Sequence, residues 1–259
     1  MHHSALKAEI IRTANCFEQV YDQHCHGYYE MLFVLNGSIR LNVEGRHVLL
    51  EKNAGIMMEP LTYHIVTGNN TAYDRLILYI ERDFIPDVIR MQLDEKLTRN
   101  PVFASRTLAG LLRKYAAALE ENDPVYAPLL DAILTEVLYA LAFDDRETGQ
   151  SLDSKRTEKL QQIVAMIDEN LHREIGLEEI ASRLYMSQSS LCHLFREEMK
   201  IPLKQYILQK KMAYARALLT EGATPGEAAN ACGYKNYASF YKIFLKAIGK
   251  TPAQISRET

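Results

Sequence analysis

Four side chains near the N-terminal end have the residue types and the spacing of a metal site. His24 and His26 stand two residues apart, Glu30 follows four residues later, and His64 lies in a later apolar segment. In a strand, His24 and His26 point to the same face because successive side chains alternate. Three imidazoles and one carboxylate that converge inside a small domain have the chemistry to bind a divalent cation.

The same four residues admit two other interpretations. They could line a metal-free effector pocket, or they could fill the domain interior as hydrogen-bonded polar groups. Their order, HxH-x3-E followed by Gly37 and by His64, resembles the pattern of the cupin barrel, in which these four positions are the metal ligands. We expect an effector pocket that needs no cofactor, and we keep a divalent metal as the alternative.

Short strands have to position these side chains. Asn36-Gly37 separates the apolar runs Met31–Leu35 and Ser38–Val43, and this dipeptide is a strong hairpin signal. Further short runs follow at His47–Leu50, Gly55–Met58, His64–Val66 and Leu76–Ile80. Many short strands with Gly and Asn turns predict a small antiparallel barrel over residues 1–83.

The pattern becomes helical after the barrel. Within a connector of residues 84–145, the segments Arg106–Glu120 and Tyr126–Phe143 have apolar residues at helical spacing. One stripe of the second segment is our candidate for a homodimer interface, with packing onto its own barrel as the alternative. The stripe consists of Ile133, Val137, Leu138 and Leu141. Turn-forming and polar residues predict a linker over residues 146–156.

Residues 157–259 are predicted to be helical throughout, and they contain one local pattern twice. Residues 177–199 and 225–248 each hold a short helix with a small inward alanine, a tight turn and a second helix with an apolar seam. This is the sequence form of a helix-turn-helix, whose second helix can enter a DNA major groove. One copy would fit a plain helical hairpin equally well, but two copies about 50 residues apart favour the helix-turn-helix interpretation.

Helical periodicity also predicts which side chains face DNA. Ser187 and Asn236 are the expected N-caps of the two recognition helices. The predicted DNA-binding residues are Ser189, Cys192, His193, Arg196, Asn236, Tyr237, Tyr241 and Lys242. Arg196 and His193 can donate to guanine acceptors or to phosphates. Charges on the connecting helix offer phosphate contacts or only a solvated face, and they are Lys204, Lys210, Lys211 and Arg216.

From about residue 163 to residue 257 the chain resembles the DNA-binding domain of the AraC/XylS family of bacterial transcription regulators. The matching residues are Ile180-Ala181, Ser187, Leu191, Leu194-Phe195, Tyr206, Ala215, Leu218-Leu219, Ala228, Gly233-Tyr234, Ser239-Phe240, Phe244 and Gly249–Pro252. The resemblance implies that both recognition helices enter successive major-groove segments on one face of the duplex. It also implies a cupin-like front domain that binds a small effector.

Composition sets the outer limits of function. The 259 residues are enough for two domains, and no apolar run reaches the roughly 18 residues that span a bilayer. Residues 160–259 carry 13 basic and 10 acidic residues, against 17 and 23 in the remainder, which leaves +3 and −6. A basic C-terminal part suits a nucleic-acid partner. The four cysteines show no CxxC spacing, which favours a reduced, cytoplasmic protein.

Together these features predict an α+β chain that acts as a cytoplasmic transcription regulator, an activator among other options, and not as an enzyme. The alternative is a metal-dependent cupin enzyme fused to a DNA-binding module. The expected partners are double-stranded DNA, a sugar or aromatic effector and a second copy of the chain, with RNA polymerase as a further candidate and no membrane.

Overall fold

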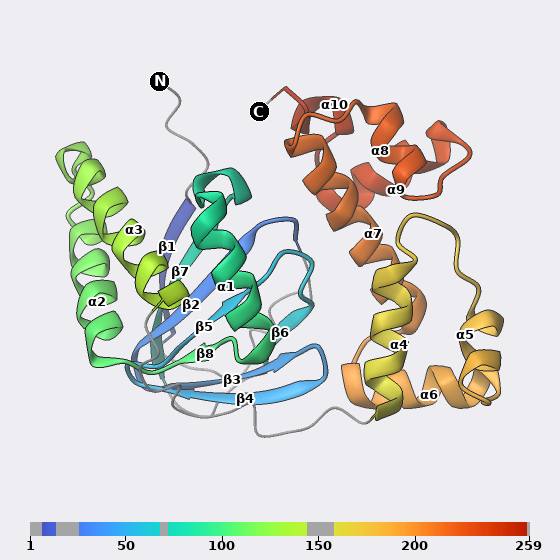
Figure 1. The fold of residues 1–259 in the computed structure, drawn as a ribbon, viewed down its shortest axis with the longest axis horizontal. Coiled ribbons are helices and arrows are strands. Elements are labelled where there is room, and N and C mark those ends of the chain that lie inside the picture. Colours follow the sequence, from blue (N-terminus) through green and yellow to red (C-terminus); the bar gives the residue numbers. More distant parts are fainter. Residues whose placement is uncertain (1–6, 14–25, 68–71, 144–157, 258–259) are drawn as a thin grey trace.

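The front half of the protein contains two antiparallel sheets. The computed structural model describes residues 7–13, 26–67, 72–143 and 158–257 (Figure 1). The larger sheet has the strand order β1-β7-β2-β5-β8 and the smaller one β4-β3-β6. The strands are β1 (Lys7–Thr13), β2 (Tyr29–Asn36), β3 (Ser38–Val43), β4 (Arg46–Glu51), β5 (Gly55–Met58), β6 (His64–Thr67), β7 (Tyr73–Ile80) and β8 (Val102–Phe103).

Apolar side chains from both sheets meet between them. Leu32 and Val34 of β2 pack with Ile39 and Leu41 of β3 in one buried cluster. The predicted hairpin at Asn36-Gly37 is confirmed, and Gly37 supplies the positive φ of +74° that its turn needs. Among the described strands no ladder joins the two sheets, so the antiparallel, cupin-like sheets are present but the barrel is not closed.

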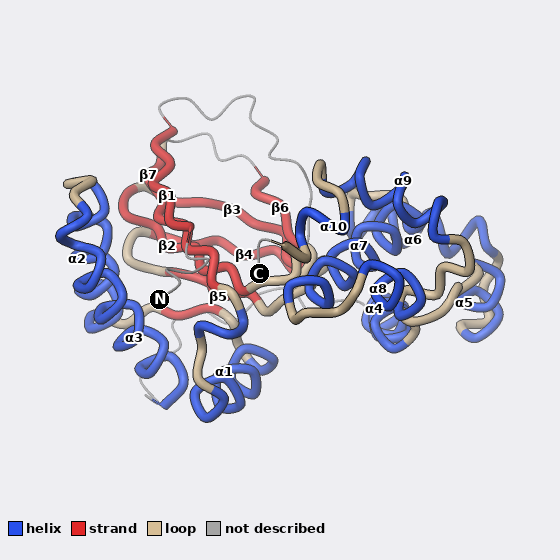
Figure 2. Tube along the Cα trace, turned by 90° about the horizontal axis from the view of Figure 1, so that it is seen from above, coloured by secondary structure: helices blue, strands red, loops and turns tan. Residues whose placement is uncertain are grey.

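Three helices cover the outer face of the larger sheet (Figure 2). Met31 and Phe33 of β2 point into this second core, which explains why β2 is apolar on both faces. The helices are α1 (Asp87–Arg99), α2 (Arg106–Glu120) and α3 (Ala127–Phe143), and the 3-10 turns are η1 (Arg82–Phe84) and η2 (Pro124–Tyr126). Helices α2 and α3 match the predicted segments, whereas β1, α1 and β8 were not predicted individually.

The stripe predicted as a dimer interface lies inside the chain. Ile133, Val137 and Leu138 are at most 3% exposed and belong to the core beneath the larger sheet, so the alternative of packing onto the chain's own domain is correct for them. By length and composition, the segment Pro124–Phe143 is the one helix among the described residues that could cross a membrane. Of that apolar window 33% is buried, and the six buried residues of α3 belong to the core beneath the larger sheet.

The C-terminal part is entirely helical over its described residues. Its helices are α4 (Glu158–Glu169), α5 (Leu177–Arg183), α6 (Gln188–Met199), α7 (Leu203–Thr220), α8 (Pro225–Ala231), α9 (Tyr237–Ile248) and α10 (Pro252–Ile255). One apolar core joins α4, α5, α6 and the start of α7, and a second joins the end of α7 with α8, α9 and α10. Helix α7 therefore belongs to both helix-turn-helix units (Figure 1).

The two turns solve the same backbone problem with different residues. Tyr185 in the first turn and Gly233 in the second both have positive φ, at +53° and +78°. The left-handed conformation costs a residue with a Cβ about 1–2 kcal/mol, and the Tyr185 side chain is 99% exposed, so it gains no packing in return.

We therefore expect Tyr185→Gly to raise the free energy of unfolding by about 1 kcal/mol in urea denaturation. The matched change in the second turn, Gly233→Ala, should lower the free energy of unfolding, because a Cβ on Gly233 would stand 2.7 Å from the Cα of Arg173. A loss of stability in Tyr185→Gly would show that the exposed tyrosine makes a contact the backbone argument ignores.

Candidate nucleic-acid interface and buried histidine cluster

The first helix-turn-helix unit presents one polar face to solvent. Helix α6 begins at its predicted N-cap, where the Ser187 hydroxyl accepts a hydrogen bond from the Ser190 backbone N–H at 3.1 Å. Its seam residues Leu191 and Phe195 are fully buried. The predicted reading residues lie opposite this seam: Ser189, His193 and Arg196 are exposed, and Cys192 is half-buried. The arrangement leaves these side chains available to a partner.

The second unit repeats this arrangement on α9. Its N-cap is Asn236, whose side-chain oxygen accepts a hydrogen bond from the Ser239 N–H at 3.2 Å. Phe240 and Phe244 are buried. Tyr237 and Lys242 are exposed, and Tyr241 is half-buried. The cap occupies the Asn236 carbonyl, so only the amide nitrogen of this side chain remains for a base or a phosphate.

A buried lysine on α7 ties the two units together. The Lys211 ammonium donates to the Arg173 carbonyl at 2.7 Å and to the Cys232 carbonyl at 2.8 Å. Arg173 lies between α4 and α5, and Cys232 ends α8, so one side chain links the entrance of the first unit to the turn of the second. Burial lowers the pKa of Lys211. The contact joins the segment before α5 to the turn after α8.

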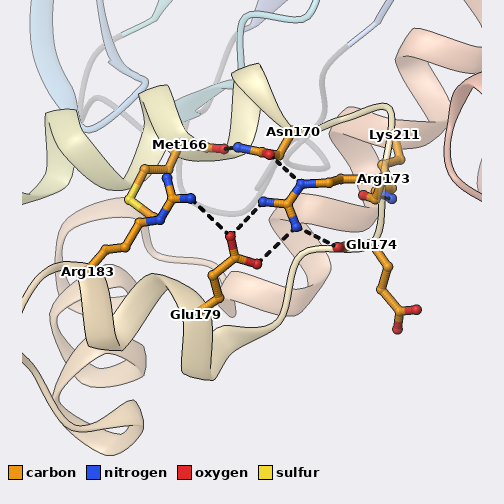
Figure 3. Close-up of polar contacts among 7 residues, drawn as sticks. All are labelled: Met166, Asn170, Arg173, Glu174, Glu179, Arg183 and Lys211. Carbon is orange, nitrogen blue, oxygen red and sulfur yellow. Dashed lines mark hydrogen bonds and ion pairs between the residues drawn. The ribbon is translucent and has the colours of Figure 1, made fainter.

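The segment that Lys211 holds is itself braced by an arginine (Figure 3). The Arg173 guanidinium makes two hydrogen bonds to the Glu179 carboxylate, at 2.6 and 2.9 Å, and a third to Asn170 at 2.6 Å. Two parallel N–H···O contacts define direction as well as distance. The pair therefore ties the loop after α4 to the first turn of α5.

For two of the four α7 charges, neither sequence alternative, a phosphate contact or a solvated face, is correct. Lys210 and Lys211 are only 3% and 8% exposed, and the ammonium group of each donates to a backbone carbonyl inside the protein. Arg216 instead lies over the Tyr28 ring of the front domain, at 5.1 Å from the ring centroid. Sequence periodicity placed all four on one helix but could not show that this helix lies between two domains.

Three of the four candidate metal ligands meet in the interior of the front domain. His26 Nε2 lies 2.6 Å and His64 Nε2 lies 3.2 Å from the same Glu30 carboxylate oxygen. All three residues are at most 5% exposed. The fourth, His24, lies outside the described residues. Tyr28 stacks on the His26 ring at 3.9 Å between centroids, which adds an aromatic wall to the cluster.

Backbone carbonyls set the orientation of both imidazoles. Nδ1 of His26 lies 3.0 Å from the Tyr28 carbonyl, and Nδ1 of His64 lies 3.1 Å from the Thr62 carbonyl. A carbonyl only accepts, so each Nδ1 carries its proton. Both Nε2 atoms then face Glu30 either as N–H donors, in which case the rings are charged, or as lone pairs directed at a shared cation. The geometry supports an ion cluster and also fits a divalent metal.

The protonation energetics agree with an ion cluster. Burial by itself would raise the pKa of Glu30, but the charges and hydrogen bonds of His64 and His26 outweigh it and hold that pKa well below its usual value. Burial would lower the pKa of His64, yet the Glu30 charge and hydrogen bond raise it. Each partner therefore stabilises the charged form of the other.

A cavity of about 420 Å³ lies beside this cluster, between the front and the C-terminal domains. Different residues line it, among them Glu59, Thr62, Asp168, His172 and Lys210. Sequence reasoning did not find this cavity, because its walls come from segments about 150 residues apart. Pro60, which cannot donate to a strand ladder, lines its front wall.

Each half of the chain matches a protein-family model. The family model described as an AraC-like ligand binding domain matches residues 7–138, and the model described as a helix-turn-helix domain matches residues 180–258. These matches contain the buried histidine cluster and both predicted reading faces, respectively.

Two curated relatives match this chain over most of their own length. The probable transcriptional regulator LumQ of Photobacterium leiognathi is 24% identical over 89% of this chain and 90% of its own. The transcriptional activator RhaR of Shigella dysenteriae is 22% identical over 95% and 91%. Among solved structures, ToxT of Vibrio cholerae O395 aligns over 96% of each chain at 11% identity with a TM-score of 0.43.

Proposed function

This chain belongs to the AraC-like family of DNA-binding transcriptional regulators, and from that premise we propose how its two halves work. The outward faces of α6 and α9 bind successive major-groove segments of one duplex. The observation that carries this proposal is the pair of capped, exposed helices whose spacing Lys211 holds. Two helices that enter successive grooves of one duplex need a constant separation, and a buried lysine that joins both units would maintain it.

Selection from a random duplex pool tests the proposal without a known operator. The purified protein should enrich one sequence class and bind it at least a thousandfold more tightly than unselected DNA, which is about the lower end for specific binders at physiological salt. Affinity should fall steeply with salt, because bound phosphates release counterions. Equal affinity for selected and unselected duplexes would contradict the proposal.

We propose that a small effector acts at the His26–Glu30–His64 cluster of the front domain. Tyr28 and Tyr79 stand beside the His26 ring, which suits a sugar or an aromatic ligand. A thermal-shift screen against sugars and aromatic acids checks this, since a ligand that binds only the folded chain stabilises it. A ligand should remain chemically unchanged, because regulation requires binding without turnover.

A divalent metal at the same cluster is the alternative, and it is the form a cupin-like enzyme would use. His26, Glu30 and His64 offer donor atoms within 4.8 Å of one another. Elemental analysis of protein purified without a metal column separates the alternatives. Less than about a tenth of an equivalent per chain would end the metal proposal and the enzyme alternative with it.

We propose a homodimer through a different surface from the one the sequence suggested. Tyr139 and Phe143 of α3 are exposed and lie 4.8 Å apart between ring centroids, on the side of the helix away from the sheet. Sedimentation at micromolar concentration tests it, with Tyr139→Ser as the disrupting variant.

We also propose that the protein activates transcription through RNA polymerase from a cytoplasmic location. Transcription with purified polymerase checks this proposal.

A further inference from the structure

The tip of the β3–β4 hairpin points from the front domain toward α4 and α6 (Figure 1), and it contacts the first helix-turn-helix unit. Asn42 donates from its amide nitrogen to the Glu198 carbonyl at 3.2 Å, while its oxygen accepts from the Gly45 N–H at 2.8 Å. Glu198 lies in the last turn of α6, where helix carbonyls have no partner within the helix. One domain therefore caps the recognition helix of the other.

The contact at the tip leaves no space for a larger residue. A Cβ on Gly45 would lie 2.4 Å from Leu160 Cδ2 and 3.2 Å from Met199 Sδ. Leu160 belongs to α4 and Met199 ends α6, and both are fully buried. The turn can take this path because Glu44 and Gly45 both adopt positive φ, at +51° and +79°.

Glu44 turns this contact into a buried ionic one. Its carboxylate accepts hydrogen bonds from the Tyr63 N–H at 2.8 Å, the Tyr206 hydroxyl at 2.7 Å and the Lys210 ammonium at 3.1 Å. Lys210 also donates to the Leu61 carbonyl at 2.6 Å and pairs with Asp168 at 2.9 Å. Glu44 is 6% exposed and Lys210 is 3% exposed. A buried pair is strongly sensitive to the loss of either partner.

A second contact lies further along α7. A Cβ on Gly27 would lie 2.9 Å from the Ala217 Cβ and 3.0 Å from the Ala213 carbonyl oxygen, so the front domain packs directly onto the helix there. Arg216 covers the Tyr28 ring. One face of α7 is thus docked over nearly its whole length.

Both contacts begin next to the buried histidines. Tyr28 stacks on His26. Tyr63 immediately precedes His64 in the sequence, and its ring lies 5.3 Å from the ring of Tyr206 on α7, measured between centroids. Each imidazole thus stands beside a tyrosine that contacts α7. Coupling of this kind needs two sites and a packed element that both of them bias, and α7 with α6 is that element.

We infer that the hairpin tip Asn42–Gly45, through the Glu44–Lys210 contact, sets the orientation of the first recognition helix and carries changes at the histidine cluster to it. Glu44 and Lys210 are positioning residues for DNA recognition. The inference rests on the proposed role of α6, but it is tested without DNA, so its failure is distinguishable from failure of that role.

Amide hydrogen exchange of the full chain provides the first test. Glu44→Gln and Lys210→Met should speed exchange about tenfold in residues 61–64 and in the last turn of α6, while β2 and β7 keep wild-type protection. Arg82→Ala is the matched control, since it removes an exposed pair between the same domains, Arg82–Glu221 at 3.8 Å, and should change nothing. Wild-type exchange at the end of α6 in both variants would overturn the inference.

Two additional arms keep the result interpretable. If β2 and β7 also lose protection, Tyr206→Phe removes a single hydroxyl and should speed exchange about threefold at the same places. His64→Gln, made in wild-type and in Lys210→Met protein, tests transmission. We expect it to alter exchange at the end of α6 only in the wild-type background, and an equal response in both backgrounds would overturn the proposed route.

Discussion

Replacing Arg196 with alanine is expected to lower affinity for a selected duplex by about tenfold or more while affinity for unselected DNA changes much less. Arg196 is exposed in the last turn of α6, and a bidentate arginine–guanine contact contributes about 1–3 kcal/mol of discrimination. Equilibrium binding to both duplexes at one salt concentration measures the ratio.

Lys242→Ala is the comparison in the second unit. Lys242 is exposed beside two tyrosines on α9, and we expect it to contact phosphate. Its loss should weaken binding to both duplexes alike and reduce the slope of log affinity against log salt by about one. If Lys242→Ala lost discrimination and Arg196→Ala did not, base reading would lie mainly in the second unit, against our assignment.

The second large effect concerns stability. Glu30→Ala should lower the free energy of unfolding by about 3–5 kcal/mol, because it leaves two buried imidazoles facing each other without their counter-charge. Urea denaturation of chelator-treated protein measures the loss. Glu51→Ala removes an exposed glutamate of β4 and should stay within about 0.5 kcal/mol of wild type, and an equal loss in both variants would contradict a special role for the cluster.

The contribution of this cluster should depend on pH in a defined way. The pKa of Glu30 is lowered on folding, so its contribution is present above the unfolded pKa of 4.5 and is lost as the pH falls through the folded value. The pKa of His64 is raised, so its contribution is complete below 6.5 and is lost as the pH rises through the folded value. The difference between wild type and Glu30→Ala should therefore be largest between these two limits.

Elements whose formation depends on neighbouring residues could be predicted from the sequence. Asn36-Gly37 determines a hairpin whatever surrounds it, and Ser187 and Asn236 cap their helices with their own side chains. The reading faces followed from the helical period for the same reason. Helix α1 was not identified separately, although Ile89, Leu93 and Leu97 stand at helical spacing on its buried face.

Non-local contacts could not be predicted in this way. Nothing near Lys210 in the sequence shows that its partner is Glu44, because the two are 166 residues apart and meet only when the domains dock. The dimer stripe on α3 failed for the same reason, since an apolar face looks identical whether it covers its own sheet or a second copy. Of the four α7 charges that the sequence left as phosphate contacts or a solvated face, Lys210 and Lys211 are buried instead.

A footprint on the selected duplex tests the central claim most directly. Two recognition helices held by Lys211 predict two protected major-groove segments on one face of the DNA, about one helical turn or 10–10.5 base pairs apart between centres. Lys211→Met should make the distance between the two protected segments variable, while each segment remains detectable. A single protected segment, or two on opposite faces of the duplex, would contradict the account.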